Sequence, residues 1–188
     1  KTGAVVYDQK CSRVVSDTIR SLGGTAVREL SGHTFIKRAF IEHDAVYAGE
    51  LSGHHFFRAV HGDDGLAASM IFAGLLRSSG QSLKSLVKTV PAYPITPDLR
   101  LPMQAEEIER LLFDLETYLS AEAVLTRTDG LRIEFPHGWG LVRPSVTEPV
   151  VTMRFEGTDH EALAAILRQV EKASNLLKGK LSPALDPG

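Results

Sequence analysis

The chain contains 188 residues, of which 43% are hydrophobic and 23% are charged, and this balance is typical of a folded globular protein. Asp and Glu number 23 against 21 Lys and Arg, so the chain lacks the overall positive field that binding to a nucleic acid requires. No apolar run approaches the roughly 18 residues that cross a membrane, and the single cysteine, Cys11, suits a reducing compartment. We therefore expect a cytoplasmic protein with no nucleic-acid partner and no membrane partner.

The first half of the chain alternates short apolar runs with segments of helical periodicity. The predicted strands are 4–7, 25–29, 45–49 and 55–60, and the predicted helices are 14–22, 34–42, 64–76 and 83–88. Asp63 and Asp64 are interpreted as the cap of the long helix. Strands separated by helices indicate βαβ units. We therefore expect an α/β domain over 1–89, with a mixed, mainly parallel sheet flanked by helices.

A proline-rich stretch follows this domain. Each proline removes a backbone donor and fixes its own φ, so the four prolines between 90 and 102 predict a linker. Beyond the linker we expect helices at 106–119 and 160–177, and strands at 123–127, 131–135, 139–142 and 150–155. Asp129-Gly130 between two of these strands is a strong hairpin signal. The second half is thus predicted to be a smaller α+β domain with an antiparallel sheet, over 103–180.

Polar residues follow three successive predicted strands of the first domain. Lys10 follows the first strand and His33 the second, and the loop after the third holds Glu50, Ser52 and His54. The carboxyl ends of parallel strands meet at one edge of a sheet, where ligands bind. A glutamate accepts two hydrogen bonds at once, which matches neighbouring hydroxyls of a sugar ring. The alternative is that these residues form only solvated polar turns. If the third loop stood alone, this alternative would be favoured, but three such loops favour a binding site.

A second polar loop lies in the predicted antiparallel domain. Arg143, Ser145 and Thr147 stand in a stretch that contains Pro144 and Pro149. A guanidinium binds phosphate oxygens bidentately, and hydroxyls and backbone N–H groups complete such a site. The loop is either a phosphate cradle or a surface turn between two strands, and composition alone favours neither.

Metal binding is not expected from the histidine pattern. The chain has seven histidines, but His33, His43, His54 and His55 are not spaced like the ligands of a compact metal site. We therefore expect no metal site within this chain.

These strings together resemble the C-terminal half, domains 3 and 4, of the α-D-phosphohexomutase superfamily, closest to bacterial phosphomannomutase/phosphoglucomutase. The motifs that carry the resemblance are Asp-Gln-Lys-Cys-Ser at 8–12, Ser-Gly-His at 31–33, Gly-Glu-Leu-Ser-Gly-His at 49–54 and Arg-Pro-Ser-Val-Thr-Glu-Pro at 143–149. A predicted strand also begins almost at the first residue, with no initiating Met, as expected of a piece of a longer chain.

The resemblance implies a function in the interconversion of hexose 1-phosphate and hexose 6-phosphate through a bisphosphorylated intermediate. In that family a phosphoserine in the first domain and a magnesium ion in the second carry the chemistry. Neither the serine string nor an Asp-Gly-Asp metal string occurs in this sequence. The resemblance therefore implies partners in hexose phosphates and in N-terminal domains of the same chain, magnesium bound outside this part, and no activity for this part alone.

The resemblance also implies roles for single residues. Glu50 and Ser52 would bind sugar hydroxyls, His33 and His54 would contact the substrate, and Lys10 would lie beside the reacting phosphate. Lys10 and His54 are also candidates for acid/base catalysis or positioning. Arg143, Ser145 and Thr147 would hold the phosphate that is not transferred.

One departure from the family pattern is Val146, where many relatives have Asn. Valine has no side-chain donor, so the resemblance implies either weaker phosphate binding or binding through a backbone N–H. The Glu-Leu-Ser string favours mannose and glucose phosphates. Two alternatives stay open: a phosphoglucosamine mutase fragment and a non-catalytic sugar-phosphate-binding module.

Overall fold

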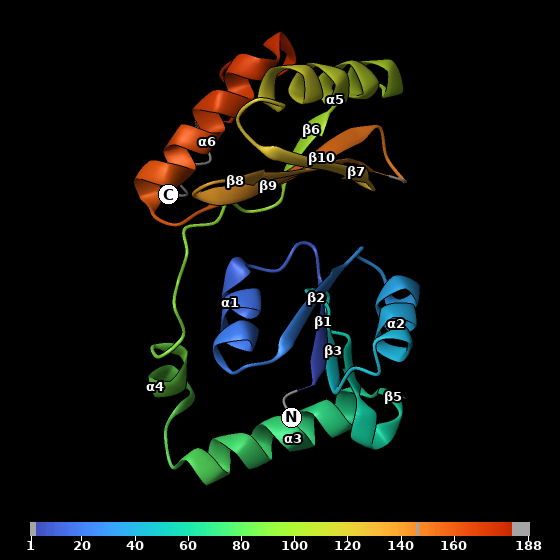
Figure 1. The fold of residues 1–188 in the computed structure, drawn as a ribbon, viewed down its shortest axis with the longest axis vertical. Coiled ribbons are helices and arrows are strands. Elements are labelled where there is room, and N and C mark those ends of the chain that lie inside the picture. Colours follow the sequence, from blue (N-terminus) through green and yellow to red (C-terminus); the bar gives the residue numbers. More distant parts are fainter. Residues whose placement is uncertain (1–2, 146, 182–188) are drawn as a thin grey trace. The chain divides into compact units, whose positions relative to one another are not determined.

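The computed structural model describes residues 3–145 and 147–181, and the chain divides into two compact units, Lys1–Ala92 and Tyr93–Gly188. Figure 1 shows each unit with its own sheet and helices. No helix in the described part of the chain is long and apolar enough to span a membrane.

The first unit is built on a mixed sheet. Its elements are β1 (Ala4–Asp8), α1 (Arg13–Ser21), β2 (Thr25–Glu29), α2 (His33–Glu42), β3 (Tyr47–Gly49), β4 (His55–Phe57), the 3₁₀ helix η1 (Arg58–Val60), β5 (Gly62–Asp63), α3 (Gly65–Ser79) and α4 (Leu83–Val87). The strand order is β2-β1-β3-β4-β5. β1 pairs in parallel with β2 and β3, while β4 is antiparallel to β3 and β5. The expected α/β fold is therefore confirmed.

Helices α1 and α2 lie on opposite faces of the parallel strands (Figure 1). Right-handed crossovers require this arrangement, because the chain moves from β1 outward to β2 and then back across β1 to β3. The core lies between the sheet and α2, where Val6, Ile36, Phe40 and Phe56 are buried. This packing fixes the carboxyl ends of β1, β2 and β3.

The segment after β4 differs from the expectation. The predicted strand 55–60 ends at Phe57, and a 3₁₀ helix and a left-handed residue, His61 (φ 57°), turn the chain into β5. Asp63 therefore belongs to β5, and Asp64 alone caps α3, with its Oδ1 accepting a hydrogen bond from Ala67 N at 2.9 Å. The interpretation of Asp63 as part of the cap is wrong.

The second unit carries an all-antiparallel sheet. Its elements are β6 (Leu99–Pro102), α5 (Ala105–Leu119), β7 (Val124–Thr128), β8 (Gly130–Phe135), β9 (Gly138–Pro144), β10 (Val150–Gly157), α6 (His160–Ala173) and the 3₁₀ helix η2 (Asn175–Leu177). The strand order is β6-β10-β9-β8-β7, and both long helices cover one face of the sheet (Figure 1). The expected α+β architecture and the β7–β8 hairpin are confirmed, although the last helix ends at Ala173 rather than at 177.

Part of the predicted linker is a strand. Leu99–Pro102 forms β6, which pairs with β10 at the edge of the second sheet. Thr96 also binds the same strand, because Thr96 N donates to Phe155 O at 2.8 Å and Phe155 N donates to Thr96 Oγ1 at 3.0 Å. The prolines hid this strand, because proline is compatible with a strand at a sheet edge but weakens the strand signal.

Candidate functional site

Asp8, the last residue of β1, holds together the loops that follow three parallel strands. Its side chain is 2% exposed. Its Oδ1 accepts hydrogen bonds from Lys10 N at 2.9 Å and from Ser31 Oγ at 2.5 Å, and its Oδ2 accepts one from Leu51 N at 3.4 Å. One buried carboxylate thus connects the loops after β1, β2 and β3. The expected meeting of these loops at one edge of the sheet is what the first unit shows.

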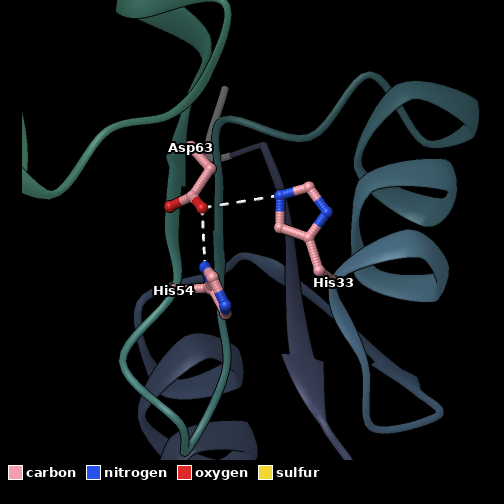
Figure 2. Close-up of side chains that lie close together, drawn as sticks. All are labelled: His33, His54 and Asp63. Carbon is pink, nitrogen blue, oxygen red and sulfur yellow. Dashed lines mark hydrogen bonds and ion pairs between the residues drawn. The ribbon is translucent and has the colours of Figure 1, made fainter.

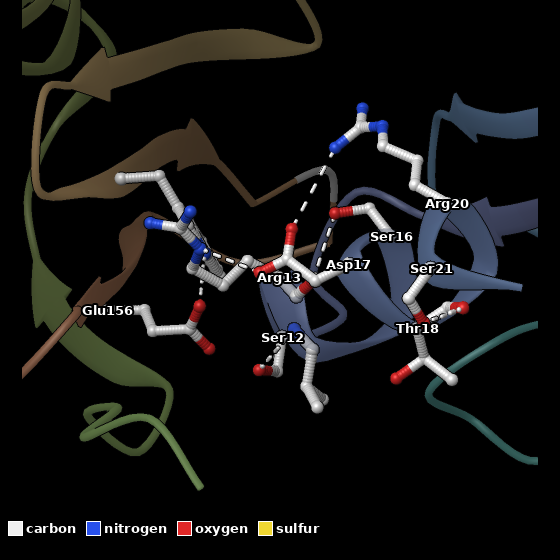
Figure 3. A network of polar contacts seen from close by, with 10 residues as sticks. Ser12, Arg13, Ser16, Asp17, Thr18, Arg20, Ser21 and Glu156 are labelled. Atoms are coloured by element: carbon white, nitrogen blue, oxygen red, sulfur yellow. Dashed lines mark hydrogen bonds and ion pairs between the residues drawn. The ribbon is translucent and has the colours of Figure 1, made fainter. Parts of the chain in front are cut away.

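The loop that carries Lys10 is short and leads directly into α1. Ser12 caps this helix by accepting a hydrogen bond from Val14 N at 3.2 Å. In the first turns, Arg13 Nε lies 3.2 Å from Asp17 Oδ2, and Asp17 Oδ1 lies 3.9 Å from Arg20 Nη1 (Figure 3). Such exposed pairs contribute little energy, so the cap does more than they do to fix the start of α1 and with it the backbone of Lys10.

The loop after β3 is a tight turn around Glu50. Glu50 N donates to His54 O at 3.0 Å, and Gly53 N donates to Glu50 O at 2.9 Å. Gly53 has a φ of +95°, which a glycine adopts without steric cost. Ser52 is exposed at the tip of the turn. Glu50 is partly buried, and its Oε2 is a buried acceptor whose hydrogen-bonding capacity is not met by any described residue.

His33, His54 and Asp63 form a cluster beside this turn. His54 Nδ1 lies 2.6 Å and His33 Nε2 lies 3.5 Å from the same oxygen, Asp63 Oδ2. Figure 2 shows both imidazole rings directed at that oxygen, one from the start of α2 and one from the loop after β3. The other oxygen, Asp63 Oδ1, accepts a hydrogen bond from His55 N at 3.0 Å. The structure therefore brings two of the predicted site histidines together, and it adds Asp63 to them.

These contacts change the acidity of Asp63. Burial alone would raise the pKa of its carboxyl group, but the hydrogen bonds from His54 and from the His55 backbone, together with the positive charges of His54 and His33, outweigh burial and hold the pKa below the ordinary 3.8. Since the folded-state pKa lies below the unfolded value, the stabilisation is fully present above the unfolded pKa. It is lost as the pH falls through the lowered folded pKa.

A carbon NMR titration of the Asp63 carboxyl group should therefore give a pKa below 3.8 in the folded chain. In His54→Gln the pKa should rise, because the strongest hydrogen bond to the carboxylate and one positive charge are removed. The exposed His43, at the end of α2, provides a matched control, and His43→Gln should leave the titration unchanged. An Asp63 pKa that is the same in wild type and His54→Gln would contradict this assignment.

An apolar hollow of about 720 Å³ adjoins the turn after β3, since Gly53 and His55 are among its lining residues. It is lined mainly by Tyr47, Phe57, Ile71, Phe72 and Leu75. Tyr47 closes one side, with its hydroxyl 2.6 Å from His55 Nδ1. Burial raises the pKa of the Tyr47 hydroxyl, and the nearby Cys11 raises it further. Its lining residues include no lysine or arginine, so the loops around Asp8 are the better candidate site for a charged ligand.

In the second unit, Arg143 is held beside the β7–β8 hairpin. Its Nη2 lies 2.7 Å from Asp129 Oδ2. Gly130, with a φ of +83°, allows this approach, because a Cβ there would lie 2.3 Å from Val142 O and 2.6 Å from Arg143 Cα. Arg143 Nε is buried and has no hydrogen-bond partner within residues 3–145 and 147–181. The guanidinium is therefore oriented by one carboxylate, and its buried Nε–H is left without an acceptor among the described residues.

The loop after β9 carries the other predicted phosphate ligands. Ser145 N donates to Val150 O at 2.9 Å, and Thr147 is exposed. Glu148 Oε2 lies 2.6 Å from Arg100 Nη2, which ties the loop to β6. Val146, whose effect on phosphate binding the sequence leaves open, lies outside the described residues.

Sequence reasoning missed three aspartates that position the predicted site residues. Asp8 organises the three loops, Asp63 contacts both histidines, and Asp129 orients Arg143. Asp8 belongs to the Asp-Gln-Lys-Cys-Ser motif, and Asp129 belongs to the Asp-Gly hairpin turn. The sequence thus already gives each aspartate one role and does not indicate the second. Only the pairing of strands distant in the sequence reveals these contacts.

Comparison with known proteins places both units. Residues 1–93 match the model of phosphoglucomutase/phosphomannomutase, alpha/beta/alpha domain III, and residues 98–173 match the model of the C-terminal domain of the same family. The phosphoglucomutase of Neisseria meningitidis serogroup A is 35% identical over 184 residues, which cover 92% of this chain and 39% of that protein. The phosphomannomutase/phosphoglucomutase of Pseudomonas aeruginosa PAO1 is 33% identical over 168 residues, covering 86% and 36%.

Solved structures show the same fold. A phosphoglucomutase/phosphomannomutase family protein from Burkholderia thailandensis superimposes with a TM-score of 0.77 at 34% identity, covering 95% of this chain and 38% of that one. The Paramecium phosphoglucomutase parafusin gives a TM-score of 0.71 at 12% identity, which shows the fold alone. The chain therefore spans less than two fifths of the length of these relatives.

Proposed function

The chain belongs to the phosphoglucomutase/phosphomannomutase family, of which it comprises domains III and IV, and on this premise we propose that it is the sugar- and phosphate-binding part of an enzyme that interconverts hexose 1-phosphates and hexose 6-phosphates. The relatives that share a third of its sequence are named phosphoglucomutase and phosphomannomutase/phosphoglucomutase. The observation that carries the proposal is the Asp8 carboxylate, which gathers the three loops that present Lys10, His33 and Glu50.

The first unit would bind the sugar. Glu50 has a buried carboxylate oxygen without a partner in the described chain, and two adjacent equatorial hydroxyls can donate to the two oxygens of one carboxylate. Ser52, at the exposed tip of the turn, would bind a further hydroxyl. His54 and His33 would contact the substrate, and His54 would also accept or supply a proton, since histidine is the commonest general acid or base. Lys10 would lie beside the phosphate that reacts.

The second unit would bind the phosphate that is not being transferred. Arg143 is oriented by Asp129 and retains guanidinium donors, and an arginine fork matches two phosphate oxygens. Ser145 and Thr147 would add hydroxyl donors. A mutase must accept its substrate in two orientations, so this loop would hold the phosphate of either end of the hexose.

The phosphoryl transfer itself would depend on the rest of the enzyme. Such transfers need positioning and charge stabilisation more than covalent help from the protein, and positioning is what this chain would supply. The magnesium ion that assists would be bound outside this chain. Mg²⁺ takes oxygen ligands, whereas the one group of three possible ligands among the described residues holds two imidazoles. We accordingly propose that this chain alone binds hexose phosphate without turning it over.

Glu50→Ala in the full-length enzyme tests the proposal. Loss of a charged acceptor for two hydroxyls should lower kcat/KM by about 100-fold with both glucose 1-phosphate and mannose 1-phosphate, and Glu50→Gln, which keeps one acceptor, should lose less. Steady-state kinetics with both substrates measure the effect. The matched control is Glu42→Gln, which alters an exposed glutamate at the end of α2 and should leave kcat/KM unchanged. A folded Glu50→Ala enzyme with normal turnover would refute the proposed role.

A further inference from the structure

We propose that His33, His54 and Asp63 form a binding site for a divalent transition-metal ion, with Zn²⁺ as the biologically relevant candidate. These residues are the one group of three possible ligands, within the part of the chain that the structure describes, whose ligand atoms all lie within 4.8 Å of one another. The set is two imidazole nitrogens and one carboxylate oxygen. Two imidazoles with one carboxylate are an established Zn²⁺ ligand set for sites that keep an open position.

The distances suit a tetrahedral ion. With Zn–N and Zn–O bonds of about 2.0–2.2 Å, neighbouring ligand atoms of a tetrahedral site lie about 3.3–3.5 Å apart. His33 Nε2 already lies 3.5 Å from Asp63 Oδ2, and His54 Nδ1 lies 2.6 Å from it. Binding would therefore need His54 to withdraw by less than 1 Å as the ion replaces its hydrogen bond to Asp63. The proton of neutral His54 would then reside on Nε2, leaving the Nδ1 lone pair for the ion.

The ligands are held by the fold before an ion arrives. Asp63 is fixed by β5, where it pairs with Phe56 of β4, and by the hydrogen bond from His55 N to its Oδ1. This bond leaves Oδ2 facing the imidazoles, as the outer partners of a metal-binding carboxylate do. The His33 ring packs on the ring of the buried Phe56, with 5.1 Å between the ring centroids, and against the His54 ring, with 5.0 Å between the centroids. These contacts restrict the Asp63 carboxylate and the His33 ring before an ion binds.

The site has room for an ion and for one more ligand. The His33 and His54 side chains are 44% and 45% exposed and Asp63 is 21% exposed, so the ion can enter from solvent. Three protein ligands leave the fourth tetrahedral position for water or an anionic oxygen. Nitrogen ligands favour Zn²⁺, Ni²⁺ and Cu²⁺ over Mg²⁺, which distinguishes this site from the magnesium site of the family.

The sequence conceals this site. The ligands stand 21 and 9 positions apart and come from the start of α2, the loop after β3 and strand β5, so they match none of the spacings of sites built on one helix or one hairpin. The expectation of no metal site in this chain followed from histidine spacing alone, and Asp63 was assigned to a helix cap.

Calorimetric titration of the 188-residue chain with Zn²⁺ tests the proposal. We expect one equivalent of Zn²⁺ to bind more than about 100-fold more tightly than Mg²⁺. We expect binding to weaken by at least about tenfold in each of His33→Gln, His54→Gln and Asp63→Asn. Substituted Co²⁺ should give the intense visible absorption of a four-coordinate ion. The matched control, His43→Gln, removes an exposed histidine outside the cluster and should bind Zn²⁺ as the wild type does.

Two results would overturn the proposal. One is a wild-type chain that binds no Zn²⁺ or prefers Mg²⁺, and the other is Zn²⁺ binding that persists unchanged in the three variants. Circular dichroism of each variant shows whether it is folded, and because three separate positions are altered, one misfolded variant leaves two to decide the matter.

The proposed metal site does not depend on the proposed function. Its expected effect on catalysis does rest on the proposed function. An ion bound by His33 and His54 would remove both side chains from the sugar, so Zn²⁺ should inhibit the full-length mutase in competition with hexose phosphate. If Zn²⁺ binds the chain but hexose phosphate does not compete with it, the metal site holds and the proposed placement of the sugar fails. If hexose phosphate binds and Zn²⁺ does not, the reverse is true.

Discussion

Replacing Asp8 by alanine is expected to lower the free energy of unfolding of the first unit by roughly 2–4 kcal/mol and to abolish hexose phosphate binding. The variant leaves Lys10 N, Ser31 Oγ and Leu51 N without the acceptor that they share. Since Asp8 is 2% exposed, removing its carboxylate also leaves a cavity at this edge of the sheet. The three loops would then lose their common anchor.

Urea denaturation measures the loss of stability, and amide hydrogen exchange of residues 10–12, 31–33 and 50–54 shows whether all three loops loosen together. Asp8→Asn keeps one carbonyl acceptor, so its free energy of unfolding should fall less than that of Asp8→Ala. The control is Asp44→Asn, because the Asp44 side chain is 87% exposed and asparagine tolerates its positive φ; its effect should stay within about 0.5 kcal/mol. If Asp8→Ala loosened only the loop after β1, Asp8 would not be the common anchor.

Gly130→Ala is expected to destabilise the second unit by roughly 2–5 kcal/mol, through backbone strain and overpacking together. The backbone φ of +83° disfavours any side chain, and the added Cβ would lie 2.3 Å from Val142 O. The relaxation would push the β7–β8 hairpin away from β9. Asp129 would then no longer reach Arg143, so phosphate binding should weaken as well as stability.

Gly53→Ala separates the two causes. Gly53 also has a positive φ, +95°, but a Cβ there would meet no atom within 4 Å, so only the backbone strain of about 1–2 kcal/mol remains. Thermal denaturation of both variants gives the comparison. If the two variants lost equal amounts of stability, the clash of the added Cβ at position 130 with β9 would contribute nothing.

Much of the fold is readable from periodicity. Helix α5 has Ile108, Leu111, Leu112 and Leu115 at helical intervals, and all four are buried in the core of the second unit. The β1, β2 and β3 runs are short and are separated by helices, which already indicates a parallel sheet. The order of the loops then predicts which polar residues follow the parallel strands.

What the sequence could not provide is pairing over distance. Strand β6 is stabilised by hydrogen bonds to β10, about 50 residues further along the chain. Its own sequence does not show this pairing, and the prolines around it weaken the strand pattern. Asp63 sits next to a genuine cap residue, Asp64, and only the β4–β5 pairing directs it to the histidines. The roles toward a substrate stay predictions for all eight proposed site residues: Lys10, His33, Glu50, Ser52, His54, Arg143, Ser145 and Thr147.

The carboxylate of Asp8 also bears on how the first unit is synthesised. Its bonds reach Ser31, 23 residues away, and Leu51, 43 residues away, and closing such long loops is slow compared with forming a helix. Helices α1 and α2, with 9 and 10 residues, are too short to be stable alone, so on the ribosome they too depend on the sheet. A nascent chain cannot assemble the edge around Asp8 until β3 and Leu51 have emerged and β3 has joined β1, so the candidate site cannot form while only its first two loops are outside the ribosome.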